Sequence, residues 1–267
     1  MKLFSLLLDF LLPPSCPVCG AMVDEHGRMC AECWGKFNWI SDPKCCVCGY
    51  PFPANIDLGD APMCPTCAAG KNELDWLRSA CVYDDVSKNI MLPFKHAGAL
   101  KYRLVMSRAM INSLRELSNK QQGISNKSSS ENNLPTQTKS LLMPYCLCPD
   151  VILPVPLATR RLWKRGYNQA TVLARPIAKH FGVPIDHDSV RRKYRPDMGH
   201  MTASARTENI RGVFRVARPD RIRGKTILLV DDVMTTGATF HELRRVLKRA
   251  GAASVIGVTF CRVVRAI

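Results

Sequence analysis

The sequence predicts an α/β protein in which helices flank a parallel sheet and a small cysteine-rich domain precedes it. Two observations lead to this fold class. Four Cys-x-x-Cys pairs fall between residues 16 and 67, and a strand, a helix and a second strand follow one another over about 35 residues at 226–261. Such a unit implies parallel strands, because these need a crossover between them. We therefore expect two domains, at residues 1–70 and 71–267.

The composition is that of a globular protein whose positive charge is concentrated in one half. The chain has 267 residues, of which 46% are hydrophobic and 22% charged, and this argues against wholesale disorder. No apolar run reaches the roughly 18 residues that a membrane span requires. Residues 1–150 contain 15 Lys and Arg against 14 Asp and Glu, whereas residues 151–267 contain 23 against 8. The basic half predicts an anionic partner.

The first twelve residues, MKLFSLLLDFLL, resemble a secretory signal peptide. Asp9 interrupts the apolar stretch, no small-residue cleavage site follows, and Pro13 and Pro14 lead directly into the first cysteine pair. We expect a short amphipathic helix packed on the next domain, and the secretory interpretation stays open at this stage.

The cysteine pairs predict two structural zinc sites. Two thiolates three positions apart on a tight turn can hold one zinc ion, so four pairs offer two sites with four ligands each. Short connecting loops favour sequential pairing, although the sequence also permits interleaved pairing. A secreted disulfide scaffold is the weaker alternative, because the rest of the chain has the character of an intracellular protein, and 13 cysteines cannot all pair internally. The expected ligands are Cys16, Cys19, Cys30 and Cys33 for one ion and Cys45, Cys48, Cys64 and Cys67 for the other.

Hydrophobic spacing predicts the elements up to the middle of the chain. Residues 78–83 have the pattern of a strand, and residues 99–118 carry apolar side chains at helical spacing. Residues 119–140 have almost no apolar content, so we expect a disordered insert there.

The second half has the alternation of an α/β domain. Residues 151–156 form an apolar strand, and residues 167–181 a helix that Pro176 should kink or interrupt. Farther on we expect strands at 226–230 and 253–261, joined by a helix at 239–251 that ends at Gly251.

Residues 227–239, ILLVDDVMTTGAT, have the pattern of an anion-binding site. Two acids, Asp231 and Asp232, follow an apolar strand, and small residues then lead into a helix. Ligands of open α/β sheets bind where strands end, and small side chains let backbone amides approach a phosphate. The acids would repel phosphate, so we expect them to face a sugar diol or a magnesium ion. The small residues are Thr235, Thr236, Gly237, Ala238 and Thr239.

Two simpler interpretations of this segment are weaker. A helix capped by Thr239 explains one threonine and leaves two adjacent acids and a row of small residues without a reason. The acidic strand of an ATPase would need a glycine-rich loop that opens a helix, whereas Gly224-Lys225-Thr226 precedes a strand.

Residues 227–239 closely resemble the phosphoribosyl pyrophosphate (PRPP) signature of type I phosphoribosyltransferases. Residues 154–170, PVPLATRRLWKRGYNQA, and 206–214, RTENIRGVF, are similar to two elements of the ComF/GntX family, which joins a double zinc ribbon to a phosphoribosyltransferase-like domain. With the Lys95 segment, the resemblance covers nearly the whole chain except the polar insert. One departure is that Met198 and Met201 stand in a region where the family often has Gln.

The resemblance implies a type I phosphoribosyltransferase-like sheet and a set of site residues. Asp231 and Asp232 would act on PRPP by contacting its ribose hydroxyls, and residues 235–239 would hold its 5′-phosphate. The turn at Leu157 and Ala158 would form the pyrophosphate loop, with Mg²⁺ bound alongside PRPP. Asn168, Gln169 and Asn209 also match family elements. Contacts to pyrophosphate or nucleic acid would come from Arg160, Arg161, Lys164, Arg165 and Arg206.

The family's role implies DNA uptake in natural transformation, on the cytoplasmic side, with single-stranded DNA and a competence helicase as partners. The resemblance does not identify what accepts the phosphoribosyl group or whether there is turnover. A nucleic-acid-binding module is a competing class, in which ribbon aromatics stack on bases or, equally, fill the ribbon core. A PRPP or nucleotide sensor is the third class. The ribbon aromatics are Trp34, Phe37, Trp39, Tyr50 and Phe52.

Overall fold

The computed structural model describes residues 13–54, 59, 61–70, 75–96, 98–125, 149–193 and 209–264. Some of the expected features lie outside these residues: the helix at 1–12, the part of the insert at 126–140, Met198 and Met201, and Arg206.

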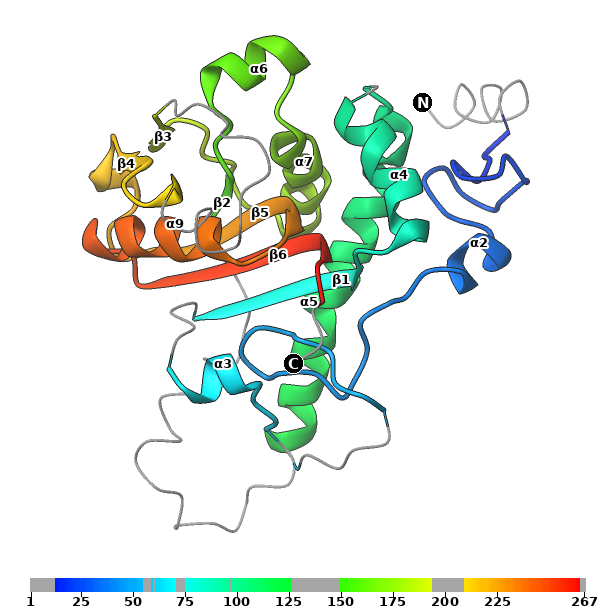
Figure 1. Cartoon of the computed structure of the whole chain (residues 1–267), viewed down its shortest axis with the longest axis horizontal. Helices are drawn as coiled ribbons and strands as arrows, with labels where there is room; N and C mark the ends of the chain where they lie inside the picture. The colour runs from blue at the N-terminus through cyan, green and yellow to red at the C-terminus, as the bar shows by residue number, and fades with distance from the viewer. Residues whose placement is uncertain are drawn as a thin grey trace.

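A sheet of four parallel strands forms the core of the fold (Figure 1). Val230 stands in register with Val258 on one side and Pro154 on the other. The two central strands are buried along nearly their whole length, which explains their continuous apolar sequence. This arrangement confirms the predicted α/β class. The strand order is β1 (Trp76–Val82), β6 (Ser254–Arg262), β5 (Thr226–Met234) and β2 (Val151–Pro154).

Helices cover both faces of this sheet. Leu228 packs in one apolar cluster with Met106 of α5 (Arg103–Ser125) and Leu173 of α7 (Gln169–Phe181). Leu229 belongs to the opposite cluster with Phe240 of α9 (Ala238–Arg249). Successive strand residues point to opposite faces, so one apolar strand contributes to both clusters. The other elements are α4 (Asp85–His96), α6 (Thr159–Arg165), the antiparallel pair β3 (Val190–Arg192) and β4 (Phe214–Val216), and the 3₁₀ turns Leu100–Tyr102 and Pro219–Arg221.

The cysteine-rich region lies along the free edge of β1. Residues 38–40, which join its two halves, run antiparallel to that strand: the amide of Ile40 donates to the carbonyl of Ala80, and the amide of Val82 to that of Asn38, each at 2.9 Å. Its short helices are α2 (Ala31–Gly35) and α3 (Pro65–Ala68). The ribbons are therefore hydrogen-bonded to the edge of the α/β sheet.

Two expectations about the second half were wrong. β5 continues to Met234, so Asp231 and Asp232 lie within the strand and not after it, because β6 extends the ladder alongside them. α7 runs through Pro176 as one continuous helix, so the expected interruption is wrong, while the alternative of a kink stays a prediction. Its buried face, with Leu173 and Ile177 fully enclosed, offsets the hydrogen bond that proline cannot make.

Helix ends differ as well. α5 continues to Ser125, so the polar insert begins as helix; a helix already formed extends at little cost. α9 starts at Ala238, with Gly237 and not Thr239 as its N-cap, and ends at Arg249 before Gly251. Across the described ranges, the structure contains no helix that combines the length and the hydrophobicity needed to cross a membrane.

Candidate substrate cavity and metal centres

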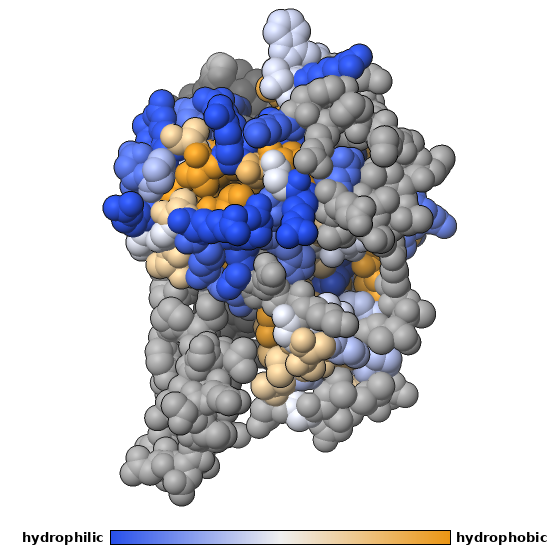
Figure 2. Space-filling view, turned by 60° about the vertical axis from the view of Figure 1, so that its left-hand side comes forward, coloured by the Kyte–Doolittle hydropathy of each residue, from blue (hydrophilic) through white to orange (hydrophobic). Residues whose placement is uncertain are grey.

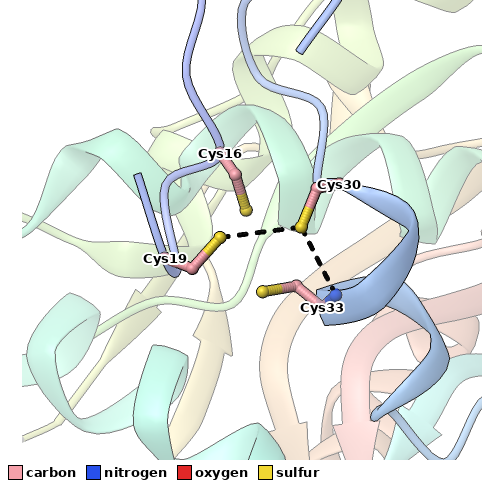
Figure 3. A group of neighbouring side chains, drawn as sticks. All are labelled: Cys16, Cys19, Cys30 and Cys33. Atoms are coloured by element: carbon pink, nitrogen blue, oxygen red, sulfur yellow. Dashed lines mark hydrogen bonds between the residues drawn. The ribbon is translucent and has the colours of Figure 1, made fainter. Parts of the chain in front are cut away.

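The first four cysteine thiols converge on one point. The sulfurs of Cys16, Cys19, Cys30 and Cys33 lie within 4.8 Å of one another, and those of Cys19 and Cys30 are 3.6 Å apart (Figure 3). Four sulfurs placed tetrahedrally at about 2.3 Å from zinc lie about 3.8 Å from each other. The cluster therefore has the size and the donor set that one zinc ion requires.

The second thiol cluster has the same geometry in a more buried setting. Cys45, Cys48, Cys64 and Cys67 also bring their sulfurs within 4.8 Å of one another, with 3.6 Å between those of Cys48 and Cys64. Three of these four residues are buried, whereas Cys19 in the first cluster is exposed. The thiols thus group sequentially and not in the interleaved arrangement. The two groups support two zinc ions.

A cavity of about 470 Å³ opens at the carboxyl ends of β2 and β5. Its wall combines the last residues of β5, the first turn of α9, the start of α7 and Lys95 from α4. Parallel strands end together at this edge, which is where open α/β sheets bind ligands. Figure 2 shows the side of the molecule that bears α9, β3 and β4. On this side, hydrophilic side chains surround a smaller apolar area.

The two acids of the cavity differ in their surroundings. Asp232 is buried and forms an ion pair with Lys95, whose Nζ lies 3.1 Å from Oδ2. The amide of Asp232 donates to Oδ1 of Asp231 at 2.9 Å. Burial first, and then the charge of Asp232, raise the pKa of Asp231 to about 7, against the opposite effect of Lys95 and Arg192. Asp231 is therefore only partly ionised near neutral pH, and a hydroxyl donor or a cation would favour its charged form.

The loop after β5 has the geometry of an anion cradle. Gly237 has φ of +78°, a conformation that favours glycine, and a Cβ there would make a tight contact of 3.2 Å with Nε2 of His241. As the N-cap of α9 it contributes no side-chain hydrogen bond to the first turn. The helix N-terminus, with its partial positive charge, therefore faces the cavity beside the hydroxyls of Thr235, Thr236 and Thr239.

The Arg-Gly-Tyr-Asn-Gln segment joins three parts of the cavity wall. Gln169 donates from Nε2 to the carbonyl of Lys95 at 3.1 Å and accepts at Oε1 from Arg165 at 3.3 Å. Asn168 donates from Nδ2 to the carbonyl of Val155 at 3.0 Å. These amides tie α4 and the end of β2 to α7, and the amide of Gln169 holds the guanidinium of Arg165 at the cavity.

The structure brings together most of the predicted substrate residues. Both acids, all five residues of the small-residue loop, Leu157 and Arg165 line the cavity. Ala158 is buried as the N-cap of α6, and Arg160 is exposed on that helix; neither lines the wall. The side chains of Arg161 and Lys164 fall outside what the structure describes.

Two cationic residues of the wall were not among the predicted substrate contacts. Lys95 lies on a helix far from the PRPP segment in sequence, and its side chain reaches the cavity from α4. Arg192, at the end of β3, lines the same cavity. No local pattern places either beside Asp231; only the family resemblance drew attention to the segment containing Lys95.

Comparisons with known protein families match two separate parts of the chain. Residues 7–68 match the double zinc ribbon domain, and residues 168–265 match the phosphoribosyl transferase domain. The chain thus joins an N-terminal part that matches a zinc ribbon to a later part that matches a phosphoribosyl transferase domain.

Proteins that are similar in sequence to this chain indicate which family it resembles. DNA utilization protein YhgH of Salmonella typhi is 38% identical over 115 residues, which are 43% of this chain and 50% of that protein. Competence protein F of Haemophilus influenzae is 33% identical over 40% of this chain and 48% of its own. Competence protein ComFC of Bacillus subtilis is 27% identical over 88% of this chain and 84% of its own. These relatives confirm the predicted resemblance to the ComF/GntX family.

The chain spans about half the length of the first curated relatives it matches. Among solved structures, the glutamine PRPP amidotransferase from B. subtilis complexed with ADP and GMP is 18% identical over 41% of this chain and 22% of that one, with a TM-score of 0.29. At that score the similarity adds nothing to the fold assignment, which rests on the strand topology and the domain match.

Proposed function

We propose that the cavity at the ends of β2 and β5 binds PRPP together with Mg²⁺. One observation carries this proposal: two adjacent carboxylates and the N-terminus of α9, which favour opposite kinds of ligand group, line a single cavity. A phosphorylated pentose has both kinds of group, since its hydroxyls suit the acids and its phosphate suits the loop amides.

The cationic side chains of the cavity wall are suited to bind the pyrophosphate of PRPP. Lys95, Arg165 and Arg192 line the cavity, and they would neutralise the pyrophosphate as it leaves. Asp232 is already paired with Lys95, so Asp231 is the carboxylate with capacity for a new hydroxyl or cation contact. Mg²⁺, when bound with PRPP, would supply further neutralisation of the leaving group. Transfer of the phosphoribosyl group would then rest on positioning and electrostatic stabilisation.

We also propose that the chain binds single-stranded DNA and acts in the cytoplasm in the use or uptake of external DNA. The names of its relatives, DNA utilization protein and competence protein, support this role. Helix α6 supports the role as well. Its Trp163 is 85% exposed, its Arg160 is also exposed, and its last residue, Arg165, lines the cavity. An exposed indole among arginines is suited to base stacking beside phosphate contacts.

The ribbon aromatics are less suited to that task. Trp34 stacks on Trp39 with ring centroids 4.0 Å apart, and Phe37 packs on the same ring and is buried. These rings stabilise the ribbon and its contact with β1. The structure therefore favours the basic C-terminal half as the DNA-binding surface.

Calorimetric titration with PRPP and Mg²⁺ tests the proposal. Replacing Asp231 and Asp232 together by Asn should abolish PRPP binding and leave single-stranded DNA binding largely intact. Asp188→Asn with Asp220→Asn, which removes two acids that do not line the cavity, is the matched control and should change neither. Absence of PRPP binding to the unchanged protein would refute the proposal. Loss of both activities in the Asp231 and Asp232 variant would indicate one shared site or a folding defect, which circular dichroism separates.

Pyrophosphate release, measured with and without single-stranded DNA, distinguishes an enzyme from a sensor. Release that depends on an added acceptor would support turnover. Tight PRPP binding with no release under any of these conditions would support the sensor instead.

A further inference from the structure

Two buried arginines reach from the sheet to the second cysteine group. Arg78 on β1 is 3% exposed, and Arg262 at the end of β6 is 5% exposed. Neither guanidinium forms an ion pair with a carboxylate among the residues that the structure describes. A buried charge without a counter-charge is strongly unfavourable, so these two arginines require another source of negative charge.

Arg262 contacts the second thiol cluster directly. Its Nη1 donates to the carbonyl of Cys48 at 2.6 Å and lies 4.0 Å from the sulfur of the same residue. The guanidinium also lies over the ring of Tyr50, with 5.2 Å from its central carbon to the ring centroid. The side chain is thereby fixed between β6 and the turn that carries Cys45 and Cys48, which we call the cysteine knuckle.

Arg78 approaches the same knuckle from the neighbouring strand. It donates from Nη2 to the carbonyl of Cys46 at 3.0 Å and from Nη1 to that of Val47 at 3.3 Å. Its guanidinium stacks over Trp76 at 4.2 Å. Carbonyl groups accept from both terminal nitrogens, whereas Nε is buried without a hydrogen-bond partner, and the carbonyl groups do not balance the charge.

A zinc ion bound to the four thiolates would supply the missing charge. The ion and the thiolates together would carry a formal charge of about −2, which equals the sum of the two guanidinium charges with opposite sign. We propose that Arg78 and Arg262 are the counter-charge of the second zinc centre and that this ion cluster fixes the end of β6 beside the anion-binding loop. They are positioning residues, since neither lines the substrate cavity.

The connection to the loop passes through the strand register. Arg262 stands opposite Met234, the last residue of β5, and the amide of Val263 donates to the carbonyl of Met234 at 2.8 Å. Thr235 follows directly. Loosening the zinc centre would therefore release the β6 end that supports the start of the loop.

The first zinc centre lacks this arrangement and serves as an internal reference. Its nearby Arg28 is half exposed and pairs with Asp24 and Glu25. Among the hydrogen bonds of the described part of the chain, no arginine donates to the first cluster's sulfurs.

Zinc release from the zinc-loaded full chain to a chromogenic chelator tests the proposal. We expect zinc to be released in two phases. Cys16→Ser, which removes a ligand of the first zinc centre, should remove the fast phase. Arg262→Gln should accelerate the slow phase about tenfold or more, because a buried thiolate cluster loses half of its counter-charge. Arg262→Lys should restore the slow phase to within about threefold, since it keeps the charge. Arg28→Gln should change neither phase.

Hydrogen exchange in the same variants tests the link to the loop. Amides of 234–239 should exchange faster in Arg262→Gln than in Arg28→Gln. A slow phase in Arg262→Gln within about twofold of the unchanged protein would overturn the counter-charge role. Faster zinc release with unchanged exchange at 234–239 would overturn the link to the loop. If Arg262→Gln is not recovered folded, a folded Arg262→Lys with normal zinc release supports the charge role, and failure of both variants contradicts it.

Discussion

If the cavity binds PRPP as proposed, the raised pKa of Asp231 predicts that the binding depends on pH. If the ionised carboxylate contacts the ligand, affinity should follow its ionised fraction. With a pKa of about 7, that fraction is about one tenth at pH 6 and about nine tenths at pH 8. We therefore expect the association constant for PRPP with Mg²⁺ to rise about tenfold between pH 6 and pH 8 and to level off above. Calorimetry in buffers of matched ionic strength measures this directly.

Asp231→Asn is the control, because it keeps the shape and removes the titration. PRPP itself also titrates in this range, so the contribution of the protein is the difference between the two curves. If the curves of the two proteins are parallel, Asp231 does not contact the ligand as a carboxylate. The stability of the unliganded protein should change with pH in the opposite direction. Its free energy of unfolding should fall as pH rises from about 4 to about 7, because in this range the folded chain retains a proton on Asp231 that the unfolded chain has released.

Three further changes have defined outcomes. Gly237→Ala should weaken PRPP binding about tenfold or more and destabilise the fold by about 1 kcal/mol, because φ is +78° and a Cβ meets the ring of His241; unchanged binding by calorimetry would contradict the cradle. Cys45→Ser with Cys48→Ser should leave one zinc per chain by metal analysis and lower the melting temperature, and two retained ions would disprove the ligand assignment. Trp163→Ala should weaken single-stranded DNA binding by about 1–3 kcal/mol in a fluorescence titration while Trp34→Ala has little effect, and the reverse order would move the DNA site to the ribbon.

Local patterns predicted the parts of the fold that depend on nearby residues. The cysteine spacing indicated both zinc groups, because each knuckle is a local turn. The apolar runs of β5 and β6 indicated a buried parallel pair. The acid-then-small-residue order at Asp231 indicated a strand that leads into a helix at a binding site, and these residues line the cavity; their anion-binding role stays a prediction.

Tertiary contacts account for what local patterns missed. Asp231 and Asp232 belong to the strand because β6 offers them a ladder partner that lies farther along the chain. Lys95 reaches Asp232 only once α4 has packed beside the sheet. The side of the sheet on which Arg78 and Arg262 meet the second zinc group depends on how the ribbon docks, and no periodicity in either segment encodes that.

A crystal structure of the protein with PRPP and Mg²⁺ is the most direct test of the proposed PRPP site. We expect the 5′-phosphate on the amides of 235–239 and the ribose hydroxyls within hydrogen-bond distance of Asp231. PRPP bound elsewhere, or a phosphate turned away from α9 in this cavity, would contradict it.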